Sequence, residues 1–150
     1  MTLTWDFVTA DKVIEEIKPH ITKHSAEVYK DEFVERSNPA WDKYKTYGEM
    51  KVCWIVTLRD NNILVGYSVF FVYEHLHHPE IKQAISDSLY LDEKYRKGRL
   101  GVELIKRGEK YLLDLGVKRI LYSAKMPVIE GILKYLGYSE YERVYKKESK

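Results

Sequence analysis

The 150-residue sequence predicts an α/β domain in which one mixed β-sheet carries helices on both faces. Two observations lead to this fold class: a middle region rich in β-branched and aromatic residues, and an amphipathic helical stripe that follows it. The predicted order of elements is β-α-α-β-β-β-α-β-α-β. Because domains of about 100–150 residues are common, we expect residues 1–150 to form a single domain.

The first part of the chain is predicted to form one strand and three helical stretches. Residues 3–9 alternate weakly between polar and apolar side chains, as a short strand does. Asp11 is a candidate cap for the helix that follows, and Pro19 is expected to interrupt or bend that helix. A second helical stretch covers residues 20–36. A third helix, over residues 39–48, is expected to begin at a proline and to end at a glycine.

The middle of the chain is predicted to be a β-hairpin followed by a further strand. Residues 51–59 and 63–73 have strand composition, and Asp-Asn-Asn at 60–62 is typical of a hairpin turn because Asn tolerates left-handed backbone conformations. Residues 83–91 form the next expected strand. It leads into a charged turn with glycines at residues 92–101.

The last part of the chain alternates helix and strand. A helix over residues 101–115 is predicted from its apolar stripe, and Gly116 is expected to end it. A strand is expected at residues 118–124, a short helix at 128–136 and a final strand at 138–145. We therefore expect the second half of the sheet to be parallel.

Composition and charge exclude several classes of protein. Hydrophobic residues make up 45% and charged residues 32% of the chain, which excludes a disordered tail. The one cysteine, Cys53, cannot form an internal disulfide, and the N-terminus does not have the pattern of a signal peptide. The longest apolar runs, such as residues 69–73, are too short to span a bilayer. We therefore expect a cytoplasmic protein that has no membrane partner.

The basic residues gather in the second part of the chain. The region before Lys94 has 10 Lys and Arg against 16 Asp and Glu, and the region from Lys94 onward has 15 against 7. The basic region begins where a glycine-containing turn with Arg96, Lys97 and Arg99 enters a helix. Unpaired N–H groups at such a helix start favour an anion, most often phosphate. Solvated helix faces remain the alternative explanation of the charge.

The turn and the order of elements resemble the GNAT superfamily of N-acetyltransferases. Its motif A reads Gln/Arg-x-x-Gly-x-Gly/Ala after a strand, and Arg96 and Gly101 match the first and last positions. Arg99 stands at the middle glycine position, and Gly98 precedes it. Further similar positions are Gly116-Val117, the strand at residues 119–123 and Leu136-Gly137-Tyr138.

The chain also resembles a narrower group, the acetyltransferase-like proteins of tailed bacteriophages, in which an Arg also occurs in the turn. The similar segments are His24-Ser25-Ala26-Glu27, Gly66-Tyr67, Leu76-His77-His78, Asp87-Ser88-Leu89-Tyr90, Gly98-Arg99-Leu100-Gly101, Lys125 and the ending Glu142-Arg143-Val144-Tyr145-Lys146-Lys147. This resemblance implies a phage or prophage origin, with the host cytoplasm as the location.

The GNAT resemblance implies transfer of an acetyl group from acetyl-CoA to a primary amine, by direct attack in a ternary complex. The diphosphate of coenzyme A would lie on the turn, the pantetheine would follow the strand that ends at Leu91, and N–H groups of that strand would stabilise the oxyanion. The residues implied in acetyl-CoA binding are Leu89, Tyr90, Leu91, Arg96, Lys97, Gly98, Arg99, Leu100, Gly101 and Val102.

Amine acetylation needs a base, and Asp87 is the first candidate because it lies four residues before Leu91. Glu27 and His24, on the helix that commonly walls the acceptor side in this family, are the next candidates. The usual acid of the family is a Tyr four residues before the Gly-aromatic pair, where this chain has Leu133. Tyr122 is a possible substitute.

Two other functions stay open. One is modification of phage DNA bases on the same fold, although the charge of the second half is modest for a DNA-binding protein. The other is a non-catalytic protein that binds a partner. The loop histidines His75, His77 and His78 do not have the spacing of a metal site, so no metal is expected. A homodimer is compatible with the sequence, and the acceptor amine is a small molecule or a protein.

Overall fold

The computed structural model describes residues 1–28 and 38–149, and these form one five-stranded sheet in the order β1-β2-β3-β4-β5. The strands are β1 (Leu3–Thr9), β2 (Cys53–Asp60), β3 (Ile63–Glu74), β4 (Lys82–Leu91) and β5 (Arg119–Leu121). The first four strands are antiparallel neighbours, and β5 pairs with β4 in parallel. The expected parallel half of the sheet is therefore reduced to this one pair.

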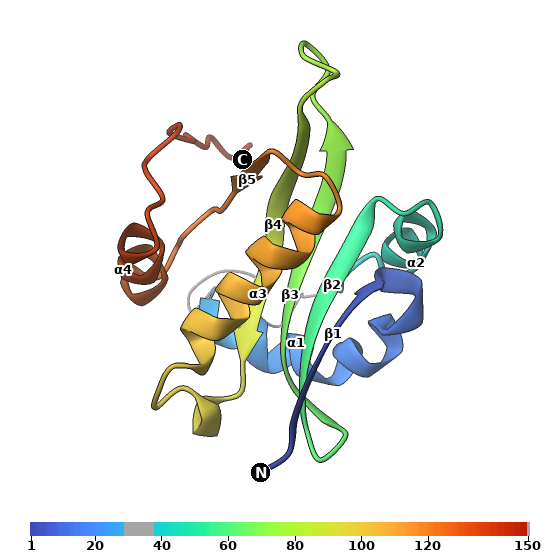
Figure 1. The fold of residues 1–150 in the computed structure, drawn as a ribbon, viewed down its shortest axis with the longest axis vertical. Coiled ribbons are helices and arrows are strands. Elements are labelled where there is room, and N and C mark those ends of the chain that lie inside the picture. The colour runs from blue at the N-terminus through green and yellow to red at the C-terminus, as the bar shows by residue number, and fades with distance from the viewer. Residues whose placement is uncertain (29–37, 150) are drawn as a thin grey trace.

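Helices cover both faces of the sheet, as the sequence predicts (Figure 1). A 3₁₀ turn, η1 (Ala10–Lys12), leads into α1 (Ile14–Val28), which lies with α2 (Trp41–Glu49) on one face. The helix α3 (Leu100–Asp114) covers the other face. Within the described part of the chain, no helix has the length and hydrophobicity that crossing a bilayer requires. The α/β fold class with one mixed sheet is confirmed.

Each face of the sheet has its own hydrophobic core. On the α1 face the buried side chains include Val13, Ile17, Ile55 and Tyr67. On the α3 face they include Val56, Phe70, Leu104 and Leu112. The alternation of Ile55 and Val56 along β2 shows how one strand supplies both cores, because successive side chains point to opposite faces.

The hairpin between β2 and β3 forms as predicted. Asn61 and Asn62 have positive φ values of 49° and 69°, and the flanking residues Asp60 and Ile63 pair with each other. Two successive residues in the left-handed region make the tight turn that matches the twist of a hairpin, and Asn reaches this region at low cost.

Pro19 does not interrupt the helix, because α1 continues through this residue. A proline inside a helix removes one backbone hydrogen bond. Ile14 and Ile17, which are almost fully buried in the core, hold the helix direction despite that loss. Asp11 does not cap α1 but lies within η1. The part of the expected second helix at 29–36 lies outside the described residues.

Gly48 does not end α2, which continues to Glu49. A Cβ atom at Gly48 would lie 2.3 Å from the backbone nitrogen of Asp11 and 2.8 Å from that of Ala10. This glycine therefore lets α2 pack directly against η1. A glycine at position 48 is therefore explained by the close approach of two backbones and not by the end of a helix.

The expected final strand at 138–145 is wrong. Residues 138–149 pair with no strand among the described residues, and Tyr141 and Tyr145 are largely exposed. The three tyrosines of this segment are spaced three and then four residues apart, so no strand places all three on one face. The segment follows α4 (Pro127–Tyr135), which forms where a helix is expected.

Candidate active site

The strands β4 and β5 separate after a short paired region. Their pairing ends at Ile85 and Leu121, whereas β4 continues to Leu91 (Figure 1). Beyond Ile85, within the described part of the chain, the side of β4 that faces away from β3 has no strand partner. The backbone N–H and C=O groups of residues 86–91 that point to this side are therefore available to a ligand, apart from the Leu91 carbonyl, which accepts a hydrogen bond from Arg96.

A β-bulge at this point turns Asp87 outward. Val69 of β3 pairs with Ser88 and Phe70 pairs with Ser86, so that Asp87 is the extra residue of β4. Its exposed carboxylate accepts a hydrogen bond of 2.7 Å from the Tyr44 hydroxyl of α2. The contact places the Asp87 carboxylate on the face of the sheet that α1 and α2 cover.

His24 lies on the same face, in an aromatic environment. Its Nδ1 atom is 3.0 Å from the hydroxyl oxygen of Tyr67, and its ring lies 5.4 Å from that of Tyr90. Burial lowers the pKa of His24, the nearby charge of Arg96 lowers it further, and the Glu27 and Asp87 carboxylates act in the opposite direction. The imidazole is therefore neutral at pH 7.

The tyrosines beside His24 keep their protons. Tyr67 and Tyr90 stack with ring centroids 5.4 Å apart. Burial raises the pKa of both phenols, and the nearby carboxylates add to this effect. The wall that α1, β3 and β4 form next to Asp87 is thus aromatic and carries a neutral imidazole.

Glu27 is paired with a residue of the turn before α3. Its carboxylate accepts a hydrogen bond from the guanidinium of Arg96, whose Nε also donates to the Leu91 carbonyl at 2.7 Å. The structure thus brings together Glu27, a candidate base, and Arg96, a residue expected to bind acetyl-CoA. Because Glu27 is already in an ion pair, its carboxylate is less available than that of Asp87 to accept a proton.

The start of α3 is open to an anion. The N-cap residue Arg99 makes no side-chain capping hydrogen bond, so the first N–H groups of the helix lack intrahelical partners. A Cβ atom at Gly98 or Gly101 would meet no atom within 4 Å, and neither glycine has a positive φ. Neither packing nor backbone conformation therefore explains these glycines, whereas a ligand that approaches the backbone would.

Not every N–H group of the turn is available. The N–H of Arg96 donates to the Glu93 carbonyl at 3.1 Å, and that of Gly98 donates to the Arg96 carbonyl at 3.0 Å. The groups left for an anion are those around Leu100, Gly101 and Val102. The side chains of Lys97 and Arg99 are exposed beside them and supply positive charge.

Tyr122 lies on the opposite face of the sheet from Asp87. Its ring packs edge-on against Phe70, with centroids 5.8 Å apart, and against Tyr138 at 5.4 Å. Its hydroxyl is buried without a hydrogen-bond partner among the described residues. Burial, followed by the charge of Glu109, raises the pKa of Tyr122. Tyr122 follows directly after Leu121, so it lies where β4 and β5 separate.

Leu133 and Cys53 are both buried. Leu133 is 7% exposed and packs on the inner side of α4, so no acid stands at that position. Cys53 is fully buried, and burial raises the pKa of its thiol to about 12. A thiol in this state is not a nucleophile.

Two tyrosines that contact the candidate residues are not apparent from the sequence. Tyr44 contacts Asp87, and Tyr67 contacts His24, each across 43 residues of sequence. Helical and strand periodicity mark such residues as core positions. No local signal reveals which polar group a phenol will meet.

The sequence matches the Acetyltransferase (GNAT) family over residues 16–129. The comparison with curated proteins found no match. Cytoplasmic location, the phage resemblance, a homodimer and DNA binding stay predictions.

Solved structures share the fold across nearly the whole chain. A GCN5-related N-acetyltransferase from Ralstonia eutropha superposes with a TM-score of 0.81 at 16% identity, covering 98% of this chain and 99% of that one. An aminoglycoside acetyltransferase from an uncultured soil metagenomic sample has a TM-score of 0.76 at 13% identity, with both chains fully covered. A predicted acetyltransferase with acetyl-CoA from Clostridium acetobutylicum has a TM-score of 0.73 at 9% identity, covering 98% and 96%.

Proposed function

Since the chain belongs to the GNAT family of acetyltransferases, we propose that it transfers the acetyl group of acetyl-CoA to a primary amine in a ternary complex. Acetyl-CoA is the donor that enzymes of this family use. The observation that carries the proposal is the bulge at Asp87, where an exposed carboxylate lies beside the unpaired stretch of β4. The acceptor amine would reach Asp87 from the face that α1 and α2 cover.

The open start of α3 supports the proposal that the diphosphate of coenzyme A binds there. Unpaired N–H groups around Leu100, Gly101 and Val102 and the positive end of the helix dipole favour an anion there. The exposed side chains of Lys97 and Arg99 add positive charge. The pantetheine amides would pair with the backbone of residues 86–91, as a neighbouring strand does.

In the proposed reaction the amine nitrogen attacks the carbonyl carbon of the thioester, and the Asp87 carboxylate accepts a proton from that nitrogen. Backbone N–H groups between Leu89 and Leu91 stabilise the negative charge that develops on the carbonyl oxygen. The carbon–sulfur bond then breaks, and the sulfur takes a proton. The products are an N-acetylated amine and coenzyme A.

We propose that Tyr122 donates the proton that the sulfur takes up. Burial keeps this phenol protonated, its hydroxyl has no partner among the described residues, and it lies where β4 and β5 separate. The phenol is re-protonated from solvent after the product leaves. Tyr122→Phe should lower kcat by about 10-fold or more, in the range seen for loss of a general acid, whereas removal of Tyr135, which is 77% exposed, should not.

The experiment that tests the proposal is calorimetric titration with acetyl-CoA, with Gly101→Glu as the variant. A glutamate at the start of α3 places a negative charge on the expected diphosphate site, so binding should be lost. Gly131→Glu is the matched control, because a Cβ at Gly131 in α4 also meets nothing within 4 Å. Absence of binding at millimolar acetyl-CoA, or equal loss in both variants, contradicts the proposal.

Leu133 favours a second candidate function, which is binding of an acyl-CoA without turnover. An apolar side chain is buried at the position where the family usually has its acid. A screen of amines with the native protein and Asp87→Asn separates the two functions. Coenzyme A release that needs Asp87 supports the enzyme, whereas tight binding without release for any amine supports the binding protein.

A further inference from the structure

Two ion pairs join α1 to the segment that leads from β4 into α3. Nζ of Lys23 lies 3.6 Å from Oδ2 of Asp92, and the Glu27 carboxylate pairs with the guanidinium of Arg96. Lys23 and Glu27 are four residues apart on α1, so they lie on the same face of that helix. Asp92 and Arg96 are likewise four residues apart. Each segment thus supplies one base and one acid, and we refer to these four residues as the charge clamp.

Arg96 is the most firmly held member of the charge clamp. Its Nε donates to the Leu91 carbonyl at 2.7 Å, and its Nη2 donates to the Glu27 carboxylate. The same guanidinium lies over the Tyr90 ring, with Cζ 5.9 Å from the ring centroid. The side chains of Arg96 and Glu27 are 37% and 27% exposed, so water and salt screen this pair less than a pair on the open surface. Two of the three guanidinium nitrogens are therefore used inside the protein.

These contacts bear on the role that the GNAT resemblance implies for Arg96. That role is acetyl-CoA binding, yet the guanidinium is held by α1 and β4, and the backbone N–H donates to the Glu93 carbonyl at 3.1 Å. The side chains of Lys97 and Arg99 are exposed beside the start of α3. Lys97 and Arg99 are therefore better placed than Arg96 to meet a diphosphate.

The charge clamp also holds the aromatic wall next to Asp87. His24 lies between Lys23 and Glu27 in the sequence of α1, and its ring centroid is 5.4 Å from that of Tyr90. The Tyr90 ring therefore contacts the guanidinium of Arg96 and the imidazole of His24. If α1 moved away from the end of β4, His24 would move with it and the wall would open.

We propose that Arg96 is a positioning residue, which holds α1 and the acceptor wall against the end of β4 through the charge clamp and does not bind the diphosphate. The inference rests on the proposed acetyl transfer and assigns Arg96 to the amine side of that site. A lysine could not replace it, because Leu91 and Glu27 are bound by two separate nitrogens and a lysine carries all its donors on one.

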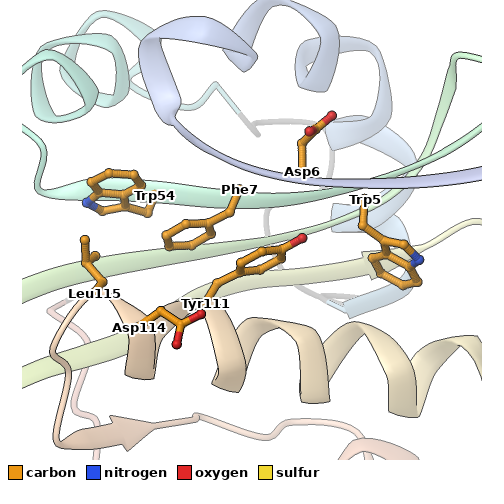
Figure 2. A pocket seen from close by; sticks show the side chains of 7 residues that line it. All are labelled: Trp5, Asp6, Phe7, Trp54, Tyr111, Asp114 and Leu115. Carbon is orange, nitrogen blue, oxygen red and sulfur yellow. The ribbon is translucent and has the colours of Figure 1, made fainter.

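The first measurement is calorimetric titration with acetyl-CoA. Arg96→Gln and Arg107→Gln are matched, because each removes a guanidinium that lies over an aromatic ring. Arg107 lies 4.7 Å from the ring centroid of Trp5, which lines the pocket on the opposite face of the sheet from α1 (Figure 2). Both variants should keep Kd within about threefold of the native value. Arg99→Gln should weaken binding by about 10-fold, as loss of a contact to a charged group does.

Steady-state kinetics then separate the two sides of the site. The probes are n-propylamine, spermidine and L-lysine, and the amine with the fastest turnover is used. At saturating acetyl-CoA, Arg96→Gln should raise the KM for the amine about 10-fold and keep kcat within about threefold, since Tyr44 and not the charge clamp holds Asp87. Arg96→Lys should raise the same KM although it keeps the charge. Arg107→Gln should change neither constant.

Hydrogen exchange of α1 tests the charge clamp without turnover. Backbone amides of residues 20–28 should exchange about fivefold faster or more in Arg96→Gln than in the native protein, because α1 opens more often when its contact with Arg96 is lost. Exchange in Arg107→Gln should equal that of the native protein. A melting curve for each variant verifies that it is folded.

Three outcomes overturn the proposal. They are acetyl-CoA binding that weakens as much in Arg96→Gln as in Arg99→Gln, an unchanged KM for the amine in Arg96→Gln, and unchanged exchange of α1 in that variant. The first would make Arg96 a ligand of the diphosphate. If the native protein binds no acetyl-CoA, the proposed function fails, and the exchange of α1 alone then decides whether Arg96 positions this helix.

Discussion

The hydroxyl of Tyr44 on α2 donates a 2.7 Å hydrogen bond to the carboxylate of Asp87 on β4. Without this contact, Asp87 would lie exposed on the strand surface with only a 3.3 Å hydrogen bond from the Ser88 hydroxyl to its carboxylate. The phenol and the Ser88 hydroxyl, at 3.3 Å, both donate to the same carboxylate oxygen, Oδ2, so in the proposed reaction Oδ1 is the oxygen that would accept the proton. This contact joins a helix of the N-terminal region to the strand that ends at the proposed donor site.

Replacing Tyr44 by Phe should therefore impair catalysis more than folding. Loss of a hydrogen bond to a charged group costs about 1.5–3 kcal/mol where it is needed, which predicts a fall of about 10- to 100-fold in kcat. Steady-state kinetics with a substrate amine measure it. Tyr47→Phe is the control on the same helix, because Tyr47 packs its ring edge-on against Phe71. An unchanged kcat in Tyr44→Phe would contradict the positioning role.

The ion pair between Glu27 and Arg96 predicts that Glu27 is not the base. We expect Glu27→Gln to leave kcat within about threefold, whereas Asp87→Asn should lower it by about 10²–10⁴-fold. Initial rates of coenzyme A release at saturating acetyl-CoA decide between them. A larger loss in Glu27→Gln than in Asp87→Asn reverses the assignment.

The close approach of α2 and η1 predicts that Gly48→Ala destabilises the protein. The added Cβ would lie 2.3 Å from the Asp11 nitrogen, and relieving such a contact by backbone shifts costs about 1–3 kcal/mol. Urea unfolding measures the change in the free energy of unfolding. Gly131→Ala, in the open space of α4, should leave stability equal or higher, because Ala favours a helix.

The state of Cys53 predicts slow chemical modification. Its side chain is fully buried and its thiol has a pKa of about 12, so almost no thiolate is present at pH 8. A thiol reagent such as Ellman's should therefore react at the rate of unfolding and reach one equivalent only in denaturant. Because the chain has one cysteine, the signal comes from this site alone. Rapid reaction of the native protein would contradict the burial of this thiol.

The lowered pKa of His24 predicts a loss of stability in acid. The folded protein keeps His24 neutral below its ordinary pKa of about 6.5, while the unfolded chain takes up a proton. The free energy of unfolding should therefore decrease as the pH falls from about 6.5 toward the lower pKa of the folded state. Unfolding curves at several pH values should show a smaller decrease in His24→Gln. An identical slope in that variant would rule out His24 as the cause.

Local sequence was sufficient for much of the fold. The two asparagines of the β2–β3 hairpin, the apolar stripe of α3 and the glycine turn before it are patterns of neighbouring residues. Their physical causes act within a few residues: backbone sterics, helical periodicity and the unpaired groups of a helix end. The donor side of the candidate site was therefore predictable from the sequence.

The contacts on the acceptor side of the candidate site, and the departures from the predicted helix ends, depend on the tertiary structure alone. Tyr44 and Asp87 are 43 residues apart, and Glu27 and Arg96 are 69 residues apart, so no periodicity relates them. The role of Gly48 and the continuation of α1 through Pro19 likewise depend on what packs against them. The free energy of such contacts comes from groups that only the folded chain brings together. A sequence pattern can therefore indicate candidate residues, but it does not predict which residues they contact.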